Sequence, residues 1–503
     1  MNSIKLPDID ELIEKSLDKA LFLMQNNYLH DADILLQQLL KVDKLNARGM
    51  QLLGLIKHKQ KEYGDAIALF VKILQIDPSN AENHNNISLA YACMGFIDKA
   101  IDHANKATEL NPNNSYYYSN LGLHYRQKNN IPKAIECFEK SIAIEPNYYA
   151  WTNIGSIYGF LKDLSKAESC FKEAIALNPE HHPSYVDLAH VYFLQGKYND
   201  AWPLYEHRLE FFPPALAFRK VYPDAKRWDF VCKFDDNLYK KQNLKNKKLA
   251  LYCEQGIGDF IQFFRFASLL KDVSLCIHTP AGLQSLIRQN TTAEIKDVFK
   301  PEEYDYHCSM ISLPHLFGGG SLDYLFGNST PPYLRCEKKA NLSNYSELKI
   351  GIAWAGNPQH PGDRARSCNL EHFKKIQAIP NVKLFGLQKE TGPRKYAGDN
   401  QATDLTINCE GMGIIDLSQH IESFEDTAAF IDAMDLIISV DTAILHLAGA
   451  MGKKTWAVLP YSPDWRWGTD GDTTRWYPSM RLYRQTNPSN WGEVFDRMAQ
   501  DLC

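Results

Sequence analysis

The chain has 503 residues, and at roughly 100 to 200 residues per domain this length indicates two to four domains. Apolar residues make up 45% and charged residues 23% of the sequence, which is typical of folded globular proteins and not of disordered or fibrous ones. The 55 Lys and Arg against 60 Asp and Glu give a net charge of −5, so we expect no positive field and no nucleic-acid partner.

The amino-terminal segment and the cysteines bear on location. Residues 1–19 mix Asp, Glu and Lys with isolated apolar residues, unlike a secretory signal, so we expect a cytoplasmic protein. No apolar run approaches the roughly 18 residues of a membrane span. The 11 cysteines include no Cys-x-x-Cys pair, so they indicate neither a disulfide framework nor a zinc site. The oligomeric state is left open.

A period of 33 or 34 residues runs through the first half of the chain, and this is the tetratricopeptide period. In such repeats small residues let two helices approach closely while an aromatic side chain fills the space between neighbouring units. We therefore predict an α-solenoid of about six units over residues 13–215. The small residues are Gly54, Ser88, Gly122, Gly155 and Ala189, then Ala66, Ala100, Ala134, Ala167 and Ala201, with aromatics at Phe70, Phe138, Phe171 and Tyr205.

Three asparagines, Asn86, Asn120 and Asn153, repeat at the same position within successive units. A ladder of amides along a concave groove could hydrogen-bond the backbone of a bound peptide whatever its sequence. The groove would then recruit a protein or peptide. The alternative is that Asn is simply the usual residue at this position of the repeat.

The second half changes from helical repeats to alternating strands and helices. After a connector at residues 216–247, strands are expected at residues 249–253 and 273–278, and again at 349–354, 382–387, 436–440 and 455–459. The pattern predicts two doubly wound, Rossmann-like lobes at residues 248–340 and 347–503. Ligands of such sheets bind beyond the carboxyl ends of the strands, so the loops there are the candidate sites.

The loop after the first of these strands contains Gln255, Gly256 and Gly258 and places Asp259 at a helix start. The glycines allow a tight turn, but the third glycine of the dinucleotide fingerprint and an acidic ribose ligand are missing, which argues against a dinucleotide-dependent oxidoreductase. On its own, Asp259 is better explained as a helix cap.

The loop after Trp354 contains Asn357, Arg364 and Arg366, and guanidinium groups there are suited to hold phosphate oxygens. The alternative is solvated surface charge. Gln388 and Lys389 follow the next strand and are expected on the same ligand.

The run at residues 436–452 is the most informative. A buried strand ends in Asp441 and Thr442 and passes into a helix from Ala443, which places helix N–H groups and the positive end of the helix dipole at the mouth of the sheet. This arrangement predicts a diphosphate site. His446 lies one helical turn further and could face the ligand or belong to the core. No metal is expected, since Asp470-Gly471-Asp472 is better explained as a solvated turn.

The Gly-Ile-Gly-Asp turn, the Asp-Thr-Ala-x-x-His helix start and Trp354-Ala355-Gly356-Asn357-Pro358 together resemble the heptosyltransferase family of GT-B glycosyltransferases. The whole chain resembles bacterial tetratricopeptide-repeat proteins that carry such a domain and end in segments like residues 460–467 and 476–485. The resemblance implies that Asp259 is the catalytic base and that Asp441, Thr442, Ala443 and His446 hold a nucleotide diphosphate. The family usually has Asp-Thr-Gly, so Ala443 leaves the donor open.

The expected function is transfer of a sugar from a nucleotide-diphosphate sugar to a hydroxyl acceptor. By the resemblance, we expect direct displacement with inversion, without a metal or another cofactor. The acceptor would be a protein or peptide recruited by the repeats, and a fragment from residue 216 onward should still bind the donor. The alternatives are transfer to lipid-linked oligosaccharide and a non-catalytic scaffold whose lobes sense a nucleotide sugar.

Overall fold

The computed structural model describes residues 9–211, 246–271, 273–298, 300, 303–317, 326–327, 329–360, 362–389, 409–488 and 490–503. Most of the expected connector, residues 216–245, lies outside these ranges. The described residues form two compact units. The first comprises residues 9–157 and Ala176–Asn178, and the second comprises Tyr158–Ile175 and the described residues from Pro179 onward.

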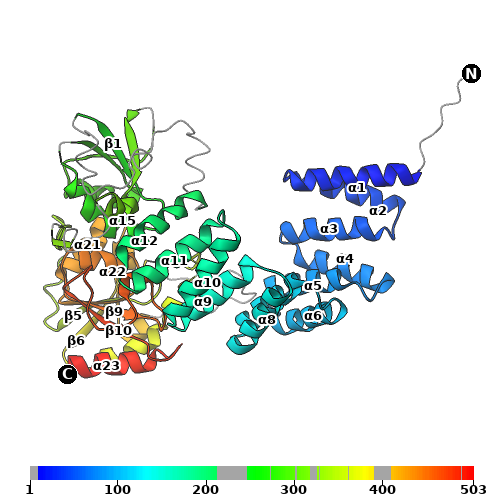
Figure 1. Ribbon diagram of the computed structural model, residues 1–503. Helices are drawn as coiled ribbons and strands as arrows, with labels where there is room; N and C mark the ends of the chain where they lie inside the picture. Colours follow the sequence, from blue (N-terminus) through cyan, green and yellow to red (C-terminus); the bar gives the residue numbers. More distant parts are fainter. Residues whose placement is uncertain are drawn as a thin grey trace, which may run out of the picture. The chain divides into compact units, whose positions relative to one another are not determined.

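Antiparallel helix pairs follow one another along residues 9–205, as Figure 1 shows for α1 to α8. Asn46, Asn80 and Asn114 each cap the first helix of a pair by accepting a hydrogen bond from a backbone N–H of its first turn. The pairs are α1 (Ile9–Gln25) and α2 (Leu29–Val42), α3 (Ala47–Lys59) and α4 (Tyr63–Ile76), α5 (Ala81–Cys93) and α6 (Ile97–Leu110), α7 (Ser115–Gln127) and α8 (Ile131–Ile144), α9 (Tyr148–Phe160) and α10 (Leu164–Leu177), and α11 (His182–Leu194) and α12 (Tyr198–Tyr205).

The small residues and aromatics of the repeat meet as predicted. A Cβ on Gly54 would lie 2.5 Å from the ring of Phe70, and one on Gly122 would lie 2.8 Å from that of Phe138. Both rings are fully buried. The glycines therefore provide the room in which each aromatic packs, and the predicted tetratricopeptide solenoid is confirmed. None of the described helices is long and apolar enough to cross a bilayer.

The N-lobe is a four-stranded parallel sheet in the order β3-β2-β1-β4. The helix α15 (Ile257–Phe264) follows β1 directly, and the 3-10 turn η3 (Arg265–Leu269) continues it. The strands are β1 (Lys248–Tyr252), β2 (Ser274–His278), β3 (Glu294–Lys296) and β4 (Tyr306–Ser309), with further helices α16 (Gln284–Arg288) and α17 (Leu313–Leu316) and the turn η6 (Met310–Ser312).

The C-lobe is a six-stranded parallel sheet in the order β10-β9-β8-β5-β6-β7. The strand order reverses between β5 and β8, so the loops after these two strands flank the crevice where doubly wound sheets bind ligands. The strands are β5 (Leu348–Ala353), β6 (Val382–Gly386), β7 (Ile415–Asp416), β8 (Leu436–Val440), β9 (Thr455–Leu459) and β10 (Met480–Arg484); the helices are α19 (Asp363–Arg366), α20 (Lys374–Gln377), α21 (Phe424–Ala433), α22 (Ala443–Ala450) and α23 (Gly492–Leu502).

The sixth helix pair shares one core with both lobes. Phe193, Trp202 and Tyr205 are almost fully buried in the same cluster as Leu249 and Phe263 of the N-lobe and Trp465 of the C-lobe. Packing therefore divides the described chain near residue 157, inside the repeat array, and joins the last repeats to the lobes.

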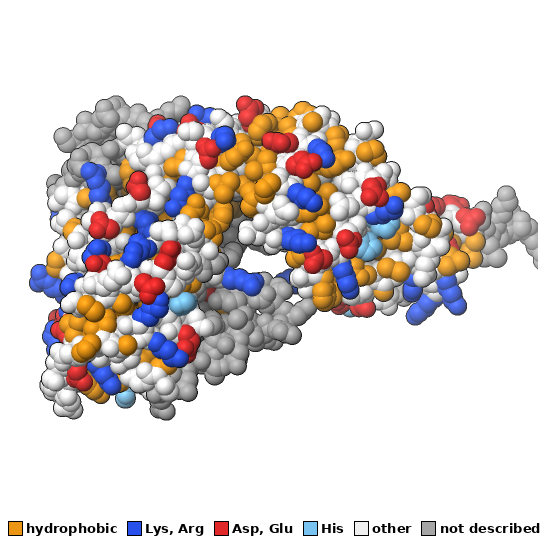
Figure 2. All heavy atoms as spheres, turned by 90° about the horizontal axis from the view of Figure 1, so that it is seen from below, with side chains coloured by type: hydrophobic (Ala, Val, Ile, Leu, Met, Phe, Trp, Pro, Cys, Tyr) orange, Lys and Arg blue, Asp and Glu red, His pale blue; other side chains and the backbone are white. Residues whose placement is uncertain are grey.

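On the face seen in Figure 2, Lys and Arg side chains are interspersed with Asp and Glu.

Candidate functional site

Two helix starts from different lobes lie against each other in the second unit (Figure 1). Helix α15 follows β1 and α22 follows β8, so both begin at the carboxyl ends of parallel strands. Gly258 marks the contact: a Cβ there would lie 2.9 Å from His446 Cδ2 and 3.7 Å from the Cα of Ala443. Glycine at this position permits the close approach, which brings the predicted Gly256–Asp259 turn and the predicted diphosphate site together.

Asp259 uses both of its carboxylate oxygens. Oδ2 accepts a 3.0 Å hydrogen bond from the Gly256 N–H, which caps α15, and Oδ1 accepts from Nη2 of Arg466 in an ion pair. Arg466 lies in the C-lobe turn η10 (Trp465–Trp467) and also donates to Gln262 Oε1 at 2.6 Å and Asp464 Oδ1 at 2.8 Å. The capping role of Asp259 is thus present, together with an ion pair that joins the two lobes. Its side chain is still 21% exposed.

Asp441 is the second carboxylate of the site and comes from the C-lobe. Oδ2 accepts a 2.9 Å hydrogen bond from Trp467 Nε1, and Oδ1 lies 3.6 Å from His446 Nε2. Burial by itself would raise the pKa of Asp441, but the contacts with His446 and Trp467 and the charge of Arg366 outweigh it and lower that pKa. Asp441 is therefore an ionised carboxylate at neutral pH.

His446 is held on both ring nitrogens. Nδ1 lies 2.9 Å from the Tyr477 hydroxyl, Nε2 faces Asp441, and the ring stacks on Trp467 with centroids 5.5 Å apart. Because Nε2 faces an ionised carboxylate, we assign the proton to Nε2, with the Tyr477 hydroxyl donating to Nδ1. The ring is only 5% exposed. This arrangement makes His446 an orienting partner of Asp441.

Thr442 stands at the N-cap of α22, and its hydroxyl lies 3.2 Å from that of Ser439. The N–H groups of the first turn of a helix have no acceptor within the helix, and the positive end of the helix dipole adds to their attraction for anions. The helix start at Ala443 can therefore receive a diphosphate oxygen.

The loop after β5, which carries Arg364 and Arg366, lies near the same site. Arg366 donates from Nε to the fully buried Asp363 at 3.2 Å, and a Cβ on Gly356 would collide with this pair. Burial lowers the pKa of His360 and the charge of Arg366 lowers it further, while Asp259 and Asp441 act against both. The loop thus lies within electrostatic reach of both carboxylates.

The remaining predicted ligand residues lie around this loop. Asn357 is exposed and accepts from the Gln359 N–H at 3.0 Å, and Arg364 is exposed as well. Gln388 is buried and accepts from the Ala355 N–H at 3.3 Å, so it holds the first residues of the loop by a hydrogen bond. Lys389 is exposed and donates to the carbonyl of Glu422 at 3.3 Å.

Both halves of the chain match known protein families, and these matches agree with the fold described above. Residues 381–476, which include Gln388, Lys389 and the β8–α22 run, match the family described as Glycosyltransferase family 9 (heptosyltransferase). Residues 17–81, 81–114, 115–148, 148–181 and 170–202 match tetratricopeptide-repeat families. The chain carries tetratricopeptide repeats and a family 9 glycosyltransferase domain.

One curated relative and two solved structures illustrate the level of similarity. Protein FlbA of Caulobacter vibrioides is 24% identical over 345 residues, which are 62% of this chain and 54% of that protein, so the chain spans about half the length of this relative. The Pseudomonas aeruginosa pilF structure is 18% identical, covers 43% of this chain and 98% of its own, and has a TM-score of 0.36. A tetratricopeptide repeat protein from Parabacteroides merdae is 19% identical, covers 44% and 95%, and has a TM-score of 0.33.

Arg466, Trp467 and Tyr477 contact the predicted site residues Asp259, Asp441 and His446, and the sequence alone assigns them no role. They lie in the two carboxyl-terminal segments that resemble the family, residues 460–467 and 476–485, and this resemblance is the sequence signal that points to them. The contact of Arg466 with Asp259 spans 207 positions and links two lobes. No local pattern of residues could have paired them.

The three repeated asparagines of the array differ in their contacts. Asn86 is 9% exposed, and its Nδ2 is buried without a hydrogen-bond partner. Asn120 donates to Asn85 Oδ1 at 2.8 Å, and Asn153 donates to the carbonyl of Tyr149 at 2.8 Å. Asn120 and Asn153 are thus bonded within the array, so the peptide-ladder role stays a prediction.

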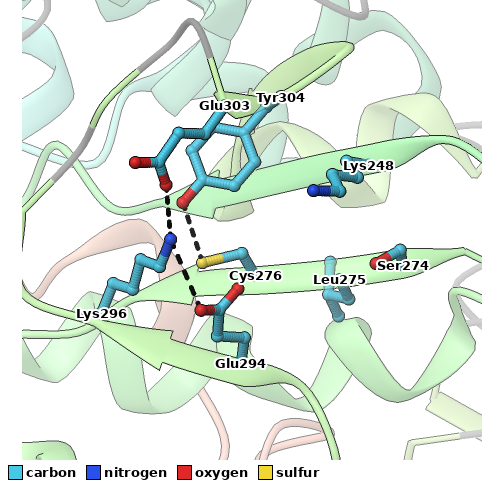
Figure 3. Close-up of a pocket in the computed structure, with 8 residues that line it drawn as sticks. All are labelled: Lys248, Ser274, Leu275, Cys276, Glu294, Lys296, Glu303 and Tyr304. Carbon is cyan, nitrogen blue, oxygen red and sulfur yellow. Dashed lines mark hydrogen bonds and ion pairs between the residues drawn. The ribbon is translucent and has the colours of Figure 1, made fainter.

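A separate small pocket lies on the N-lobe sheet (Figure 3). Lys296 there sits between Glu294, at 3.4 Å, and Glu303, at 2.5 Å, and the Tyr304 hydroxyl donates to Cys276 Sγ at 3.2 Å. Its volume of about 40 Å³ is far below the roughly 300 Å³ or more of small-molecule sites, and its lining includes Lys248 and Ser274, the first residues of β1 and β2. Its lining is Lys248, Ser274, Leu275, Cys276, Glu294, Lys296, Glu303 and Tyr304. It is not the donor site.

In the ranges that the structure describes, no three His, Cys, Asp or Glu side chains converge as a metal-binding group. The charges of the site are instead paired with one another: Arg466 with Asp259 and Asp464, and Arg366 with Asp363.

Proposed function

We propose that the chain transfers a sugar from a nucleotide-diphosphate sugar to a hydroxyl acceptor by direct displacement with inversion and without a metal ion. The observation that carries the proposal is the approach of α15 to α22 at Gly258, which puts an N-lobe carboxylate and a C-lobe helix start in one place. Such a transfer needs a base for the acceptor hydroxyl and positive charge for the departing diphosphate. The family 9 domain fits this chemistry.

The step itself balances simply. The acceptor hydroxyl loses its proton to a carboxylate, its oxygen forms a bond to the anomeric carbon, and the bond from that carbon to the diphosphate oxygen breaks. The negative charge that develops on the diphosphate is received by the helix start at Ala443 and by Arg366. Asp441, oriented by His446 and Trp467, is placed beside this helix start.

Asp259 is the base in this proposal. It is ion-paired to Arg466 of the C-lobe, and its side chain is still 21% exposed, so an acceptor hydroxyl can reach it. Glu254, the other carboxylate of the same turn, is 4% exposed, and its oxygens are engaged by Arg208 Nε at 2.7 Å and the Ser309 hydroxyl at 2.5 Å. Glu254 is thus almost fully buried, whereas the side chain of Asp259 is partly exposed to an acceptor.

The acceptor in this proposal is a protein or peptide that the repeats recruit, because stacked tetratricopeptide units form an extended concave surface of the kind that binds such partners. Transfer to lipid-linked oligosaccharide is the alternative acceptor class. Incubating the full chain with a nucleotide sugar and either a protein extract or a lipid-oligosaccharide fraction distinguishes the two, since only one fraction should gain labelled sugar.

Donor binding is tested by the melting temperature of the full chain with ADP-, UDP- and GDP-sugars. A ligand at 100 times its dissociation constant stabilises the folded state by about 2.7 kcal/mol. We expect one nucleotide class to raise the melting temperature by several degrees in a concentration-dependent way. No shift with any of the three at millimolar concentration would contradict the proposal.

A non-catalytic scaffold that senses a nucleotide sugar is the second candidate, and the engagement of both Asp259 oxygens favours it. The two functions differ in one readout. A sensor binds the nucleotide sugar without consuming it, whereas a transferase releases the nucleoside diphosphate.

A further inference from the structure

The sixth repeat, defined here as α11, α12 and the following turn η1 (Glu206–Glu210), reaches the turn that carries Asp259 from outside the lobes. It contacts the N-lobe at the turn itself and the C-lobe at η10. Both contacts lie inside the second compact unit.

The first contact to the turn is a buried guanidinium. Arg208 is 1% exposed, and its Nε donates to Glu254 Oε1 at 2.7 Å, directly beside Gln255 and the glycine turn. Nη1 donates to Glu206 Oε1 at 2.6 Å and to the Tyr205 carbonyl at 3.1 Å, and Nη2 donates to the hydroxyls of Ser312 at 2.9 Å and Ser309 at 3.4 Å. All five N–H donors are therefore used, in the fixed directions of a planar fork.

The second contact to the turn is a neutral hydrogen bond. Gln255 Nε2 donates to the Tyr205 hydroxyl at 3.0 Å. The Tyr205 ring lies under the Arg208 guanidinium, whose carbon is 4.8 Å from the ring centroid. Two adjacent residues of the turn, Glu254 and Gln255, are thus each held by a side chain of the sixth repeat.

The same repeat also holds the C-lobe partner of Asp259. The ring of Phe193 stacks on Trp465 with centroids 4.1 Å apart and planes 21° apart, and Trp202 meets Trp465 edge-on at 5.9 Å. Trp465 immediately precedes Arg466, which pairs with Asp259. Both ends of the ion pair that joins the lobes therefore rest on one helical repeat.

We propose that the sixth repeat is part of the catalytic unit, and that Arg208 and Tyr205 are positioning residues that fix the Glu254–Asp259 turn against α22. The catalytic reading of this turn rests on the proposed function, but the positioning itself does not. The fixed directions of the guanidinium explain why an arginine, and not a lysine, fits between Glu254, Glu206 and two serines.

Hydrogen exchange on the full chain tests the positioning without any substrate. We compare Tyr205→Phe, which removes one hydroxyl, with Glu254→Gln, which keeps the side-chain shape, and with Arg208→Met and Arg208→Lys. Amide exchange of residues 256–264 should accelerate by about tenfold to a hundredfold when the charged contact of Arg208 with Glu254 is lost, and by about twofold to tenfold when the neutral contact of Tyr205 is lost. Exchange in β5 and β6 should not change. Tyr205→Phe and Glu254→Gln decide the matter if Arg208→Met does not fold.

Lys162→Met is the matched control. Lys162 lies 4.2 Å from the ring centroid of Tyr461, so its loss disturbs a contact of the fifth repeat with the C-lobe and leaves the turn untouched. Wild-type exchange of residues 256–264 in the folded Tyr205→Phe and Glu254→Gln variants would overturn the proposal. Equal acceleration in Lys162→Met would also overturn it, because it would show general loosening.

A second readout links positioning to turnover. With UDP-glucose, GDP-mannose and ADP-heptose as donors, we expect Tyr205→Phe to reduce kcat by about tenfold and leave the donor KM within about twofold, since α22 is not touched. Arg208→Lys should retain more kcat than Arg208→Met. If no donor is consumed even by the wild type, the proposed function is wrong. The exchange experiment still tests the positioning, because it uses no substrate.

Discussion

Replacing Asp259 with Asn separates a catalytic base from a helix cap. The amide oxygen of the substituted side chain can still accept from the Gly256 N–H, so the cap is kept, but an amide cannot take a proton from the acceptor. Loss of a general base typically reduces the rate by about 10²- to 10⁴-fold. We therefore expect transfer to fall by at least two orders of magnitude.

The stability cost of the same change comes from the contact with Arg466. Arg466 loses one charged partner but keeps Asp464 at 2.8 Å and Gln262 at 2.6 Å. Asn has only one acceptor oxygen, so when that oxygen caps the Gly256 N–H, the amide NH2 faces the guanidinium and the hydrogen bond to Arg466 is lost, at a cost of about 1.5 to 3 kcal/mol. The melting temperature should therefore fall while the chain stays folded, and the affinity for ADP, UDP and GDP should stay near that of the wild type.

The assay is the initial rate of sugar transfer or donor hydrolysis by the purified full chain, with Asp464→Asn as the matched control. Asp464→Asn removes the other carboxylate on Arg466 without removing the base, so it reports the effect of the ion-pair network alone. We expect it to lower the rate by less than about tenfold. Transfer by Asp259→Asn within a few-fold of the wild type would refute the assignment of Asp259 as the base.

Three further changes test other parts of the molecule. Thr442→Val should weaken binding of the matching nucleoside diphosphate by about tenfold to a hundredfold, with Thr442→Ser near wild type, in calorimetric titrations; equal affinities would remove Thr442 from the donor site. A fragment from residue 216 loses Arg208 and leaves the buried Glu254 without its charged partner, which lowers the free energy of unfolding by about 3 to 5 kcal/mol. It should therefore be insoluble or melt far below a fragment from Tyr158, and a stable 216–503 fragment would contradict the shared core. Burial lowers the pKa of His124 from 6.5 to about 4, so the unfolded chain binds this proton at a higher pH than the folded chain, and stability is lost as the pH falls from about 6.5 toward 4. In urea unfolding, His124→Gln should lose less stability between pH 7.5 and pH 5 than the wild type, and an equal loss in both proteins would contradict this linkage.

The solenoid and most strands could be predicted because their signals are local. Gly54 and Phe70 recur with a fixed period, and β1, β2, β5, β6, β8 and β9 are apolar runs that begin or end within one residue of the expected positions. The strands β3 and β7 contain three and two residues, too few to produce a pattern, and β4 is largely polar. These were missed, as was β10.

The site was predicted as helix starts but not as a network. Asp259 and Thr442 stand out locally because each follows a strand and begins a helix. Arg208 and Arg466 do not, because a charged residue is expected at the surface and their partners Glu254 and Asp259 lie 46 and 207 positions away. The expected separation of array and lobes at residue 216 overlooked Trp202 for the same reason, since its burial depends on two lobes that follow it in the chain.

Release of nucleoside diphosphate is the decisive measurement for the proposed sugar transfer. The full chain is incubated with ADP-heptose, UDP-glucose or GDP-mannose, with and without a protein acceptor fraction, and the nucleoside diphosphate is measured for the wild type and for Asp259→Asn. We predict release with one donor that increases with the acceptor fraction and falls by at least about a hundredfold in Asp259→Asn. Binding of a nucleotide sugar without any release, or equal release by the two proteins, would contradict the proposed transfer.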